Sequence, residues 1–153
     1  MTLRENIYLI LEKYSKLTPK QINDVIDLKL ALVGLSGFQN YRPAEISGGM
    51  KKRAALARAM ALDPNILFFD EPSSGLDPVT SASLDLLIGE LNTALRTTMV
   101  IVSHDLESIL NISHRILMLD SSVKGILAIG TPYEMRNFID NELVYNFFNR
   151  KIH

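Results

Sequence analysis

The sequence predicts an α/β domain with a mostly parallel sheet and a helical lobe at its amino-terminal end. From residue 63 onward, short apolar or β-rich runs alternate with helical patterns, as expected where helices connect parallel strands. Before Gly34, by contrast, apolar residues recur only at helical spacing. We therefore expect a helical subdomain over residues 1–62 and the remainder of an α/β core over residues 63–153.

Composition narrows the class of protein. The chain has 153 residues, 47% hydrophobic and 22% charged, as in ordinary globular domains. A formal net charge of −1 gives no sign of electrostatic binding to nucleic acid. Because cysteine is absent, disulfides, thiolate metal sites and a cysteine nucleophile are excluded. No run approaches the roughly 20 apolar residues of a membrane-spanning helix.

The lobe is expected to contain two helices followed by a loop. A helix over residues 3–15 is predicted because its apolar residues recur at spacings of three and four, namely Leu3, Ile7, Ile10, Leu11 and Tyr14. Thr18 and Pro19 start a second helix, which ends near Gly34. Its expected core positions are Ile22, Val25, Ile26, Leu28, Leu30 and Val33. A loop with two glycines and a proline then reaches Ile46.

The α/β part is expected to begin with the helix that Ser47 caps. Residues 65–70, between two prolines, read as a buried parallel strand. Asp77 and Pro78 start the next helix. The elements expected after it are a strand over 97–104, a helix after Asp105, strands over 114–120 and 124–130, a helix from Thr131, and a docked tail with Val144, Phe147 and Phe148.

The stretch Ser47-Gly48-Gly49 has features of an anion site. Each glycine in a helix costs about 1 kcal/mol, which makes sense where a ligand must approach the backbone. Free N–H groups and the positive end of the helix dipole suit a terminal phosphate. A simply capped helix start is the alternative. We expect the cations that follow, Lys51, Lys52 and Arg53, to form a solvated helix face rather than to assist the phosphate.

Two carboxylates and a histidine follow predicted strands. Asp70 and Glu71 come at the carboxyl end of the first strand, where open α/β sheets place ligands. We expect Asp70 to hold Mg²⁺ and Glu71 to act as general base on the attacking water. His104 ends the next strand and is expected to contact a γ-phosphate, a structural or solvated role being the alternative. His114 and His153 receive no role.

These motifs together resemble the ATPases of the ATP-binding-cassette (ABC) family. "ISGGM" resembles the signature sequence, "ILFFDE" the Walker B strand with its catalytic glutamate, "SGLD" the D-loop, and His104 the switch histidine. Ile46 and Met50 depart from the usual Leu and Gln. The resemblance implies part of a P-loop NTPase core that uses ATP and Mg²⁺, with Asp77 at the nucleotide. The string from Ile46 to Pro64 resembles the ATPases of lipid-asymmetry-maintenance transporters, which move phospholipid.

The resemblance also implies parts outside these motifs. A Walker A loop needs Gly-x-x-x-x-Gly-Lys-Ser/Thr, and none of the eight glycines is followed by lysine. Neither Gln21 nor Gln39 has the context of the Q-loop. We therefore expect an amino-terminally truncated chain that is inactive alone and either poorly stable or self-associating. The implied partners are a second ABC ATPase domain and a membrane permease, but no nucleic acid. The implied location is cytoplasmic, peripheral on the inner face of the inner membrane.

Two other functions stay open at this point. One is a non-catalytic interaction protein that binds a partner ATPase, although Asp70, Glu71 and His104 together argue against it. The other is a fragment of a DNA-repair or chromosome-organising ATPase, which the compact helical lobe and the near-neutral charge disfavour.

Overall fold

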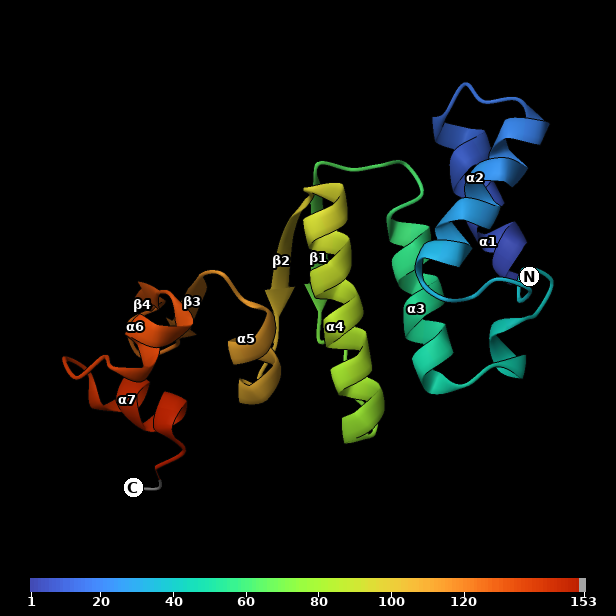
Figure 1. The fold of residues 1–153 in the computed structure, drawn as a ribbon. Helices are drawn as coiled ribbons and strands as arrows, with labels where there is room; N and C mark the ends of the chain where they lie inside the picture. Colours follow the sequence, from blue (N-terminus) through green and yellow to red (C-terminus); the bar gives the residue numbers. More distant parts are fainter. Residues whose placement is uncertain (152–153) are drawn as a thin grey trace. The chain divides into compact units, whose positions relative to one another are not determined.

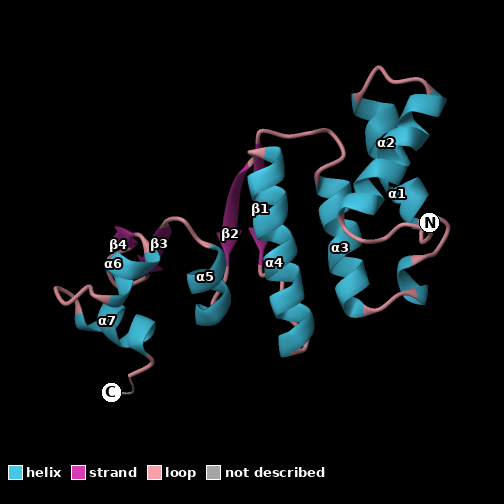
Figure 2. Cartoon of the chain, in the orientation of Figure 1, coloured by secondary structure: helices cyan, strands magenta, loops and turns pink. Residues whose placement is uncertain are grey.

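A computed structural model describes residues 1–151 of the chain. The chain divides into two compact units, one ending at Val102 and the other beginning at Ser103 (Figure 1). The α/β class is confirmed, since helices alternate with strands from α3 to β3 and a further strand and two helices follow (Figure 2). The predicted boundary between residues 62 and 63 stays a prediction.

Two helices, each with a threonine as its N-cap, form the amino-terminal lobe. Thr2 caps α1 (Leu3–Tyr14) and Thr18 caps α2 (Pro19–Leu32). In both, the threonine side chain accepts the third backbone N–H, and the Glu or Gln at that position returns a bond to the cap. The fully buried side chains of this region are Ile7, Leu11, Ile26, Leu30, Val33 and Leu35.

One predicted core position of α2 is wrong. Leu28 is 56% exposed, and the neighbouring Lys29 is buried at 3% exposure instead. Leu28 lies two residues beyond Ile26, which places it about 200° around the helix from the buried face. Lys29 follows Ile26 by three residues and lies on that face. Its ammonium pairs with the carboxylate of Asp63, whose side chain remains exposed.

The rest of the first unit contains the stretch Ser47-Gly48-Gly49, the pair Asp70 and Glu71, and Asp77. A short 3₁₀ turn, η1 (Pro43–Glu45), precedes α3 (Gly48–Ala59). Strand β1 (Ile66–Asp70) pairs in parallel with β2 (Thr98–Val102). Helix α4 (Pro78–Leu95) connects the two strands and runs beside them (Figure 1).

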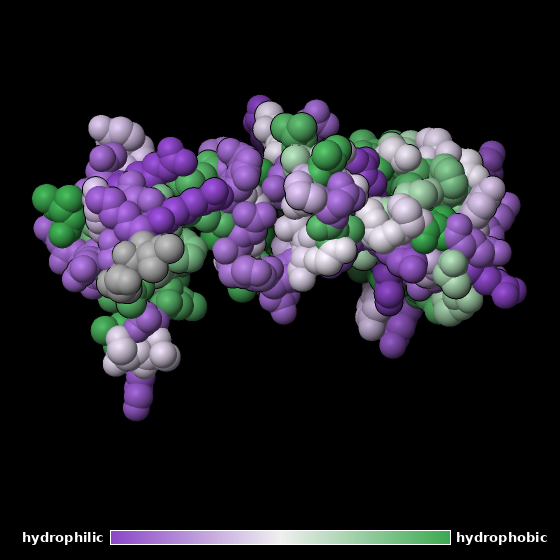
Figure 3. Space-filling view, turned by 90° about the horizontal axis from the view of Figure 1, so that it is seen from below, coloured by the Kyte–Doolittle hydropathy of each residue, from purple (hydrophilic) through white to green (hydrophobic). Residues whose placement is uncertain are grey.

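Only one face of the β1–β2 pair is buried. Successive strand residues point to opposite faces. Leu67 is buried, whereas Phe68 is 76% exposed and lies opposite the exposed Val100. The expectation of a fully buried strand is therefore wrong for the face that carries Ile66 and Phe68. Figure 3 likewise shows hydrophobic side chains reaching the surface at several places.

The second unit is built around an antiparallel hairpin. It contains α5 (Leu106–Ile112), the strands β3 (Ile116–Asp120) and β4 (Gly125–Gly130), α6 (Pro132–Arg136) and α7 (Glu142–Asn149). A short turn joins β3 to β4, which permits only antiparallel pairing. The core is Ile116, Ala128, Met135, Val144 and Phe148.

The expected docking of the tail is confirmed for Val144 and Phe148. Phe147 lies at the edge of this core, partly exposed, with its ring 5.0 Å from that of Phe148. Within the part of the chain that the structure describes, none of the helices is long and apolar enough to cross a membrane.

Candidate phosphate and metal site

Helix α3 begins as the sequence predicts. The Ser47 side chain accepts the backbone N–H of Met50 at 3.2 Å, and its own backbone is extended. Ser47 and Gly48 are exposed whereas Gly49 is buried, so the first turn of α3 presents its backbone to solvent at its first residues only. This arrangement leaves the start of the helix accessible to an anion.

Packing inside the chain accounts for one of the two glycines. A Cβ on Gly49 would lie 2.5 Å from Cγ2 of Thr80, in the first turn of α4. A Cβ on Gly48 would lie at an ordinary 3.6 Å from Leu76. Gly49 is therefore required for the contact between α3 and α4, whereas this packing does not require Gly48.

The two carboxylates differ in their surroundings. Asp70 is exposed at the end of β1, and Glu71 is half-buried in the turn that follows. Glu71 has φ 47°, in the left-handed region that non-glycine residues rarely occupy. Its N–H donates to the Val102 carbonyl at 2.9 Å, which continues the pairing with β2.

The carbonyl of Glu71 accepts two hydrogen bonds. One comes from the backbone N–H of Ser74 at 3.2 Å, and the other from Nζ of Lys52 on α3 at 3.3 Å. The main chain of Glu71 is thus held by β2, by the following turn and by the helix that Ser47 opens. Left-handed backbone of this kind persists where the surrounding structure over-determines it, and it occurs often at functional sites.

Asp70 is a reasonable single ligand for magnesium. Mg²⁺ usually keeps several waters and takes one or two carboxylates together with phosphate oxygens. Among residues 1–151, no three His, Asp or Glu side chains cluster closely enough to form an all-protein metal cage. The donor set therefore fits an ion shared with a nucleotide and does not fit a structural metal site.

The turn over residues 74–77, which resembles a D-loop, has a structural role. Gly75 adopts φ 79°, and Asp77 then caps α4 by accepting the N–H groups of Val79 and Thr80. The Thr80 hydroxyl also donates to Asp77, at 2.5 Å. These hydrogen bonds lower the pKa of Asp77 below its usual value. The bond from the Thr80 hydroxyl contributes most to this shift. Its predicted contact with a nucleotide stays a prediction.

The expected solvated face of α3 is wrong for two of its three cations. Lys51 is exposed, but Lys52 and Arg53 are half-buried. Arg53 donates to the Val33 carbonyl at 3.2 Å and to the Ser83 hydroxyl at 2.7 Å, which joins α3 to α2 and α4. The sequence held a signal for this, because Arg53 follows Gly49 by four residues and shares its buried helix face.

His104 lies in the second unit, exposed, between β2 and α5. The next residue, Asp105, caps α5 by accepting the N–H of Glu107 at 3.0 Å. The role of His104 at a γ-phosphate stays a prediction. His114 is exposed ahead of β3, and His153 lies outside the described residues.

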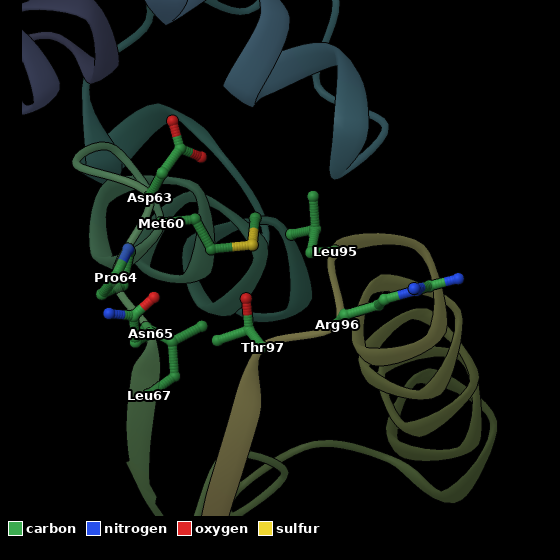
Figure 4. Close-up of a pocket in the computed structure, with 8 residues that line it drawn as sticks. All are labelled: Met60, Asp63, Pro64, Asn65, Leu67, Leu95, Arg96 and Thr97. Carbon is green, nitrogen blue, oxygen red and sulfur yellow. The ribbon is translucent and has the colours of Figure 1, made fainter.

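A small hollow of about 130 Å³ lies at the opposite ends of the strands (Figure 4). Met60, Leu95 and Thr97 point into it, while the side chain of Arg96 points away. Because it borders the amino ends of β1 and β2, this hollow is not part of the site at Asp70 and Glu71.

Strand β1 ends at the carboxylate pair Asp70 and Glu71, the helix that begins with two glycines bonds to Glu71 through Lys52, and Asp77 caps α4. Residues 1–74 match the family described as ABC transporter. The intermembrane phospholipid transport system ATP-binding protein MlaF of Escherichia coli is 42% identical over 137 residues, which are 89% of this chain and 50% of MlaF. The probable ribonucleotide transport ATP-binding protein mkl of Mycobacterium tuberculosis is 41% identical over 149 residues, 97% of this chain and 41% of mkl.

A solved structure has the same fold. The ATP-binding cassette MJ0796, a dimer in a post-hydrolysis state bound to ADP and Pi, matches with a TM-score of 0.70 and 28% identity. The match covers 86% of this chain and 56% of MJ0796. The chain is therefore related in sequence and fold to the ATP-binding proteins of ABC transporters, and the resemblance seen in its motifs is confirmed. It spans about half the length of the curated relatives it matches.

Proposed function

We propose that this chain supplies the signature, Walker B, D-loop and switch-histidine part of an ATP-binding subunit that drives an ABC transporter. The observation that carries the proposal is the placement of Asp70 and Glu71 at the carboxyl end of a parallel strand. Glu71 is there held in left-handed backbone and bonded to the helix that begins after Ser47. The division into a helical subdomain over 1–62 and a catalytic part over 63–153 belongs to this proposal.

Each residue has a role in hydrolysis under this proposal. Asp70 holds Mg²⁺, an ion that neutralises phosphate charge when bound. Glu71 takes a proton from the attacking water, and His104 contacts the γ-phosphate. The Ser47 hydroxyl and the backbone of Ser47, Gly48 and Gly49 bind a phosphate held by a second ATPase domain. Asp77 borders the same nucleotide.

Phospholipid is the proposed cargo. Among the relatives, the Mla-type ATPases are named for phospholipid transport, and MlaF shares 42% identity over 137 residues. We propose a membrane permease and a second ABC ATPase domain as partners, in line with the dimeric MJ0796 cassette. Nucleic acid is not among the proposed partners. The proposed location is the cytoplasmic face of the inner membrane, peripheral to that permease.

A chimera tests the catalytic assignment. In E. coli MlaF, the 137 matched residues are replaced by those of this chain, so that the rest of MlaF completes the domain. We expect ATP hydrolysis, and we expect Glu71→Gln to lower kcat by about 10²–10⁴-fold while ATP binding persists, since a positioned base contributes that much. Glu90→Gln, at an exposed glutamate of α4, is the matched control and should leave the rate unchanged.

Two results would overturn the assignment. A chimera that binds ATP but turns over equally well with Glu71→Gln would remove Glu71 as the base. A chimera that folds and binds ATP but never hydrolyses it would favour a non-catalytic interaction protein. The isolated chain, which contains no Gly-x-x-x-x-Gly-Lys-Ser/Thr sequence, should show no turnover in the same assay.

A further inference from the structure

We infer that Lys52 is a positioning residue for Glu71: its ammonium holds the main chain from which the proposed base projects. This inference rests on the proposed role of Glu71. It adds a residue outside the four motifs, on the second turn of α3.

The backbone of Glu71 needs such a hold. Glu71 has φ 47°, and for a residue with a Cβ this left-handed backbone conformation is higher in free energy than the extended or right-handed one. If the hold were lost, relaxation of φ would swing the direction in which the carboxylate leaves the chain. The N–H of Glu71 is fixed to Val102, so its carbonyl end is the part that Lys52 restrains.

The ammonium of Lys52 is well placed to provide this restraint. It donates to the Glu71 carbonyl at 3.3 Å in a part-buried setting, and a bond from a charged donor is stronger than one between neutral groups. The helix that carries Lys52 is fixed at the adjacent residue, because the Arg53 guanidinium donates to the Val33 carbonyl and to the Ser83 hydroxyl. Lys52 thus connects a fixed helix to a strained turn.

Three variants of the full chain separate positioning from general stability. Lys52→Met keeps the aliphatic stem and removes the donor, whereas Lys52→Arg keeps a charged donor. Lys51→Met, at the exposed neighbour on the same helix, is the matched control. The readout is the three-bond HN–Hα coupling of Glu71 by NMR, which follows its φ, together with amide exchange of Ser74.

We expect Lys52→Met to shift the Glu71 coupling toward extended backbone and to speed Ser74 exchange. Lys52→Arg should restore both, and Lys51→Met should change neither. If Lys52→Met leaves the coupling and the exchange at their original values, the inference is wrong. Neither measurement needs ATP turnover, so this failure is distinguishable from failure of the catalytic assignment of Glu71.

A double-mutant cycle decides the matter if Lys52→Met unfolds the chain. Glycine occupies left-handed backbone without strain, so Glu71→Gly should make Lys52 dispensable. We expect Lys52→Met to raise the unfolding equilibrium constant at least about threefold more with Glu71 than with glycine there. The inference is equally supported if Lys52→Met alone does not fold but the double variant Lys52→Met, Glu71→Gly does. Equal losses in both backgrounds, or no folding in either, would make Lys52 a general structural residue.

Discussion

The helical lobe and the β1–β2 pair bury their apolar side chains to very different extents. Ile26 and Leu30 on α2 are fully buried, at 0% exposure. On the strands, Phe68 and Val102 are mostly exposed although both are as apolar as the lobe's core. The lobe therefore has a core of its own, whereas one face of the β1–β2 pair leaves its apolar side chains exposed.

Within the first unit, the residues that form the buried core are therefore different from the candidate site residues. Four of the candidate site residues, Ser47, Gly48, Asp70 and Glu71, lie where α3 begins and β1 ends, outside the best-buried part of the lobe. Hydrogen bonds from α3, through Lys52 and Arg53, connect the two regions. We expect core substitutions in the lobe to unfold the chain, and substitutions on the open strand face to change association instead.

The largest expected effect is from Ile26→Ala. Removing this fully buried side chain should lower the free energy of unfolding by about 2–5 kcal/mol, through lost burial and the cavity left behind. Urea denaturation followed by far-UV circular dichroism measures the loss.

Phe68→Ser is the contrasting variant for this measurement. Because Phe68 is exposed, the free energy of unfolding of this variant should stay within about 0.5 kcal/mol of the original. Self-association, measured by sedimentation velocity, should fall because an exposed apolar patch is reduced. Equal destabilisation by Ile26→Ala and Phe68→Ser would show that the strand face is buried in solution and would break the comparison.

A smaller loss is expected from Gly49→Ala, at the contact between α3 and α4. The new Cβ would lie 2.5 Å from Cγ2 of Thr80, and overpacking of this kind typically costs about 1–3 kcal/mol. The same denaturation assay measures it.

Thr80→Ser tests whether that contact is the cause. Serine lacks Cγ2 but keeps the hydroxyl that bonds to Asp77, so it should recover most of the stability lost by Gly49→Ala. If Gly49→Ala costs as much in the Thr80→Ser background as in the original chain, the glycine serves another purpose, such as close approach of a ligand to the backbone.

The elements of the fold were predictable because their ends are fixed locally. Thr18, Ser47 and Asp77 each accept a backbone N–H within three residues, so the start of each helix is encoded in a few adjacent positions. The motif order of the candidate site was readable for the same reason, since it needs only the linear sequence.

What the sequence could not reveal depends on partners distant along the chain. Lys29 is buried because Asp63 meets it 34 residues later, and Glu71 takes left-handed backbone where Lys52 and Val102 hold it. Phe68 was predicted to be buried because a continuous apolar run is typical of a strand covered on both faces, and whether both faces are covered depends on elements elsewhere in the chain. Each of these outcomes is set by packing between elements and not by local propensity.

The smallest expected effect concerns Asp77 and follows from its lowered pKa. A carboxyl whose pKa is below its unfolded value, 3.8, contributes stability above that pH and loses it as the pH falls through the folded pKa. Asp77→Asn cannot titrate, so the advantage of the original chain over this variant in urea denaturation should shrink below about pH 4. Thr80→Val, which removes the strongest donor to Asp77, should weaken that pH dependence. Parallel stability curves for the original chain and the Asp77→Asn variant would mean that the charge of the carboxylate adds no pH-dependent stability to the cap, and the prediction would be wrong.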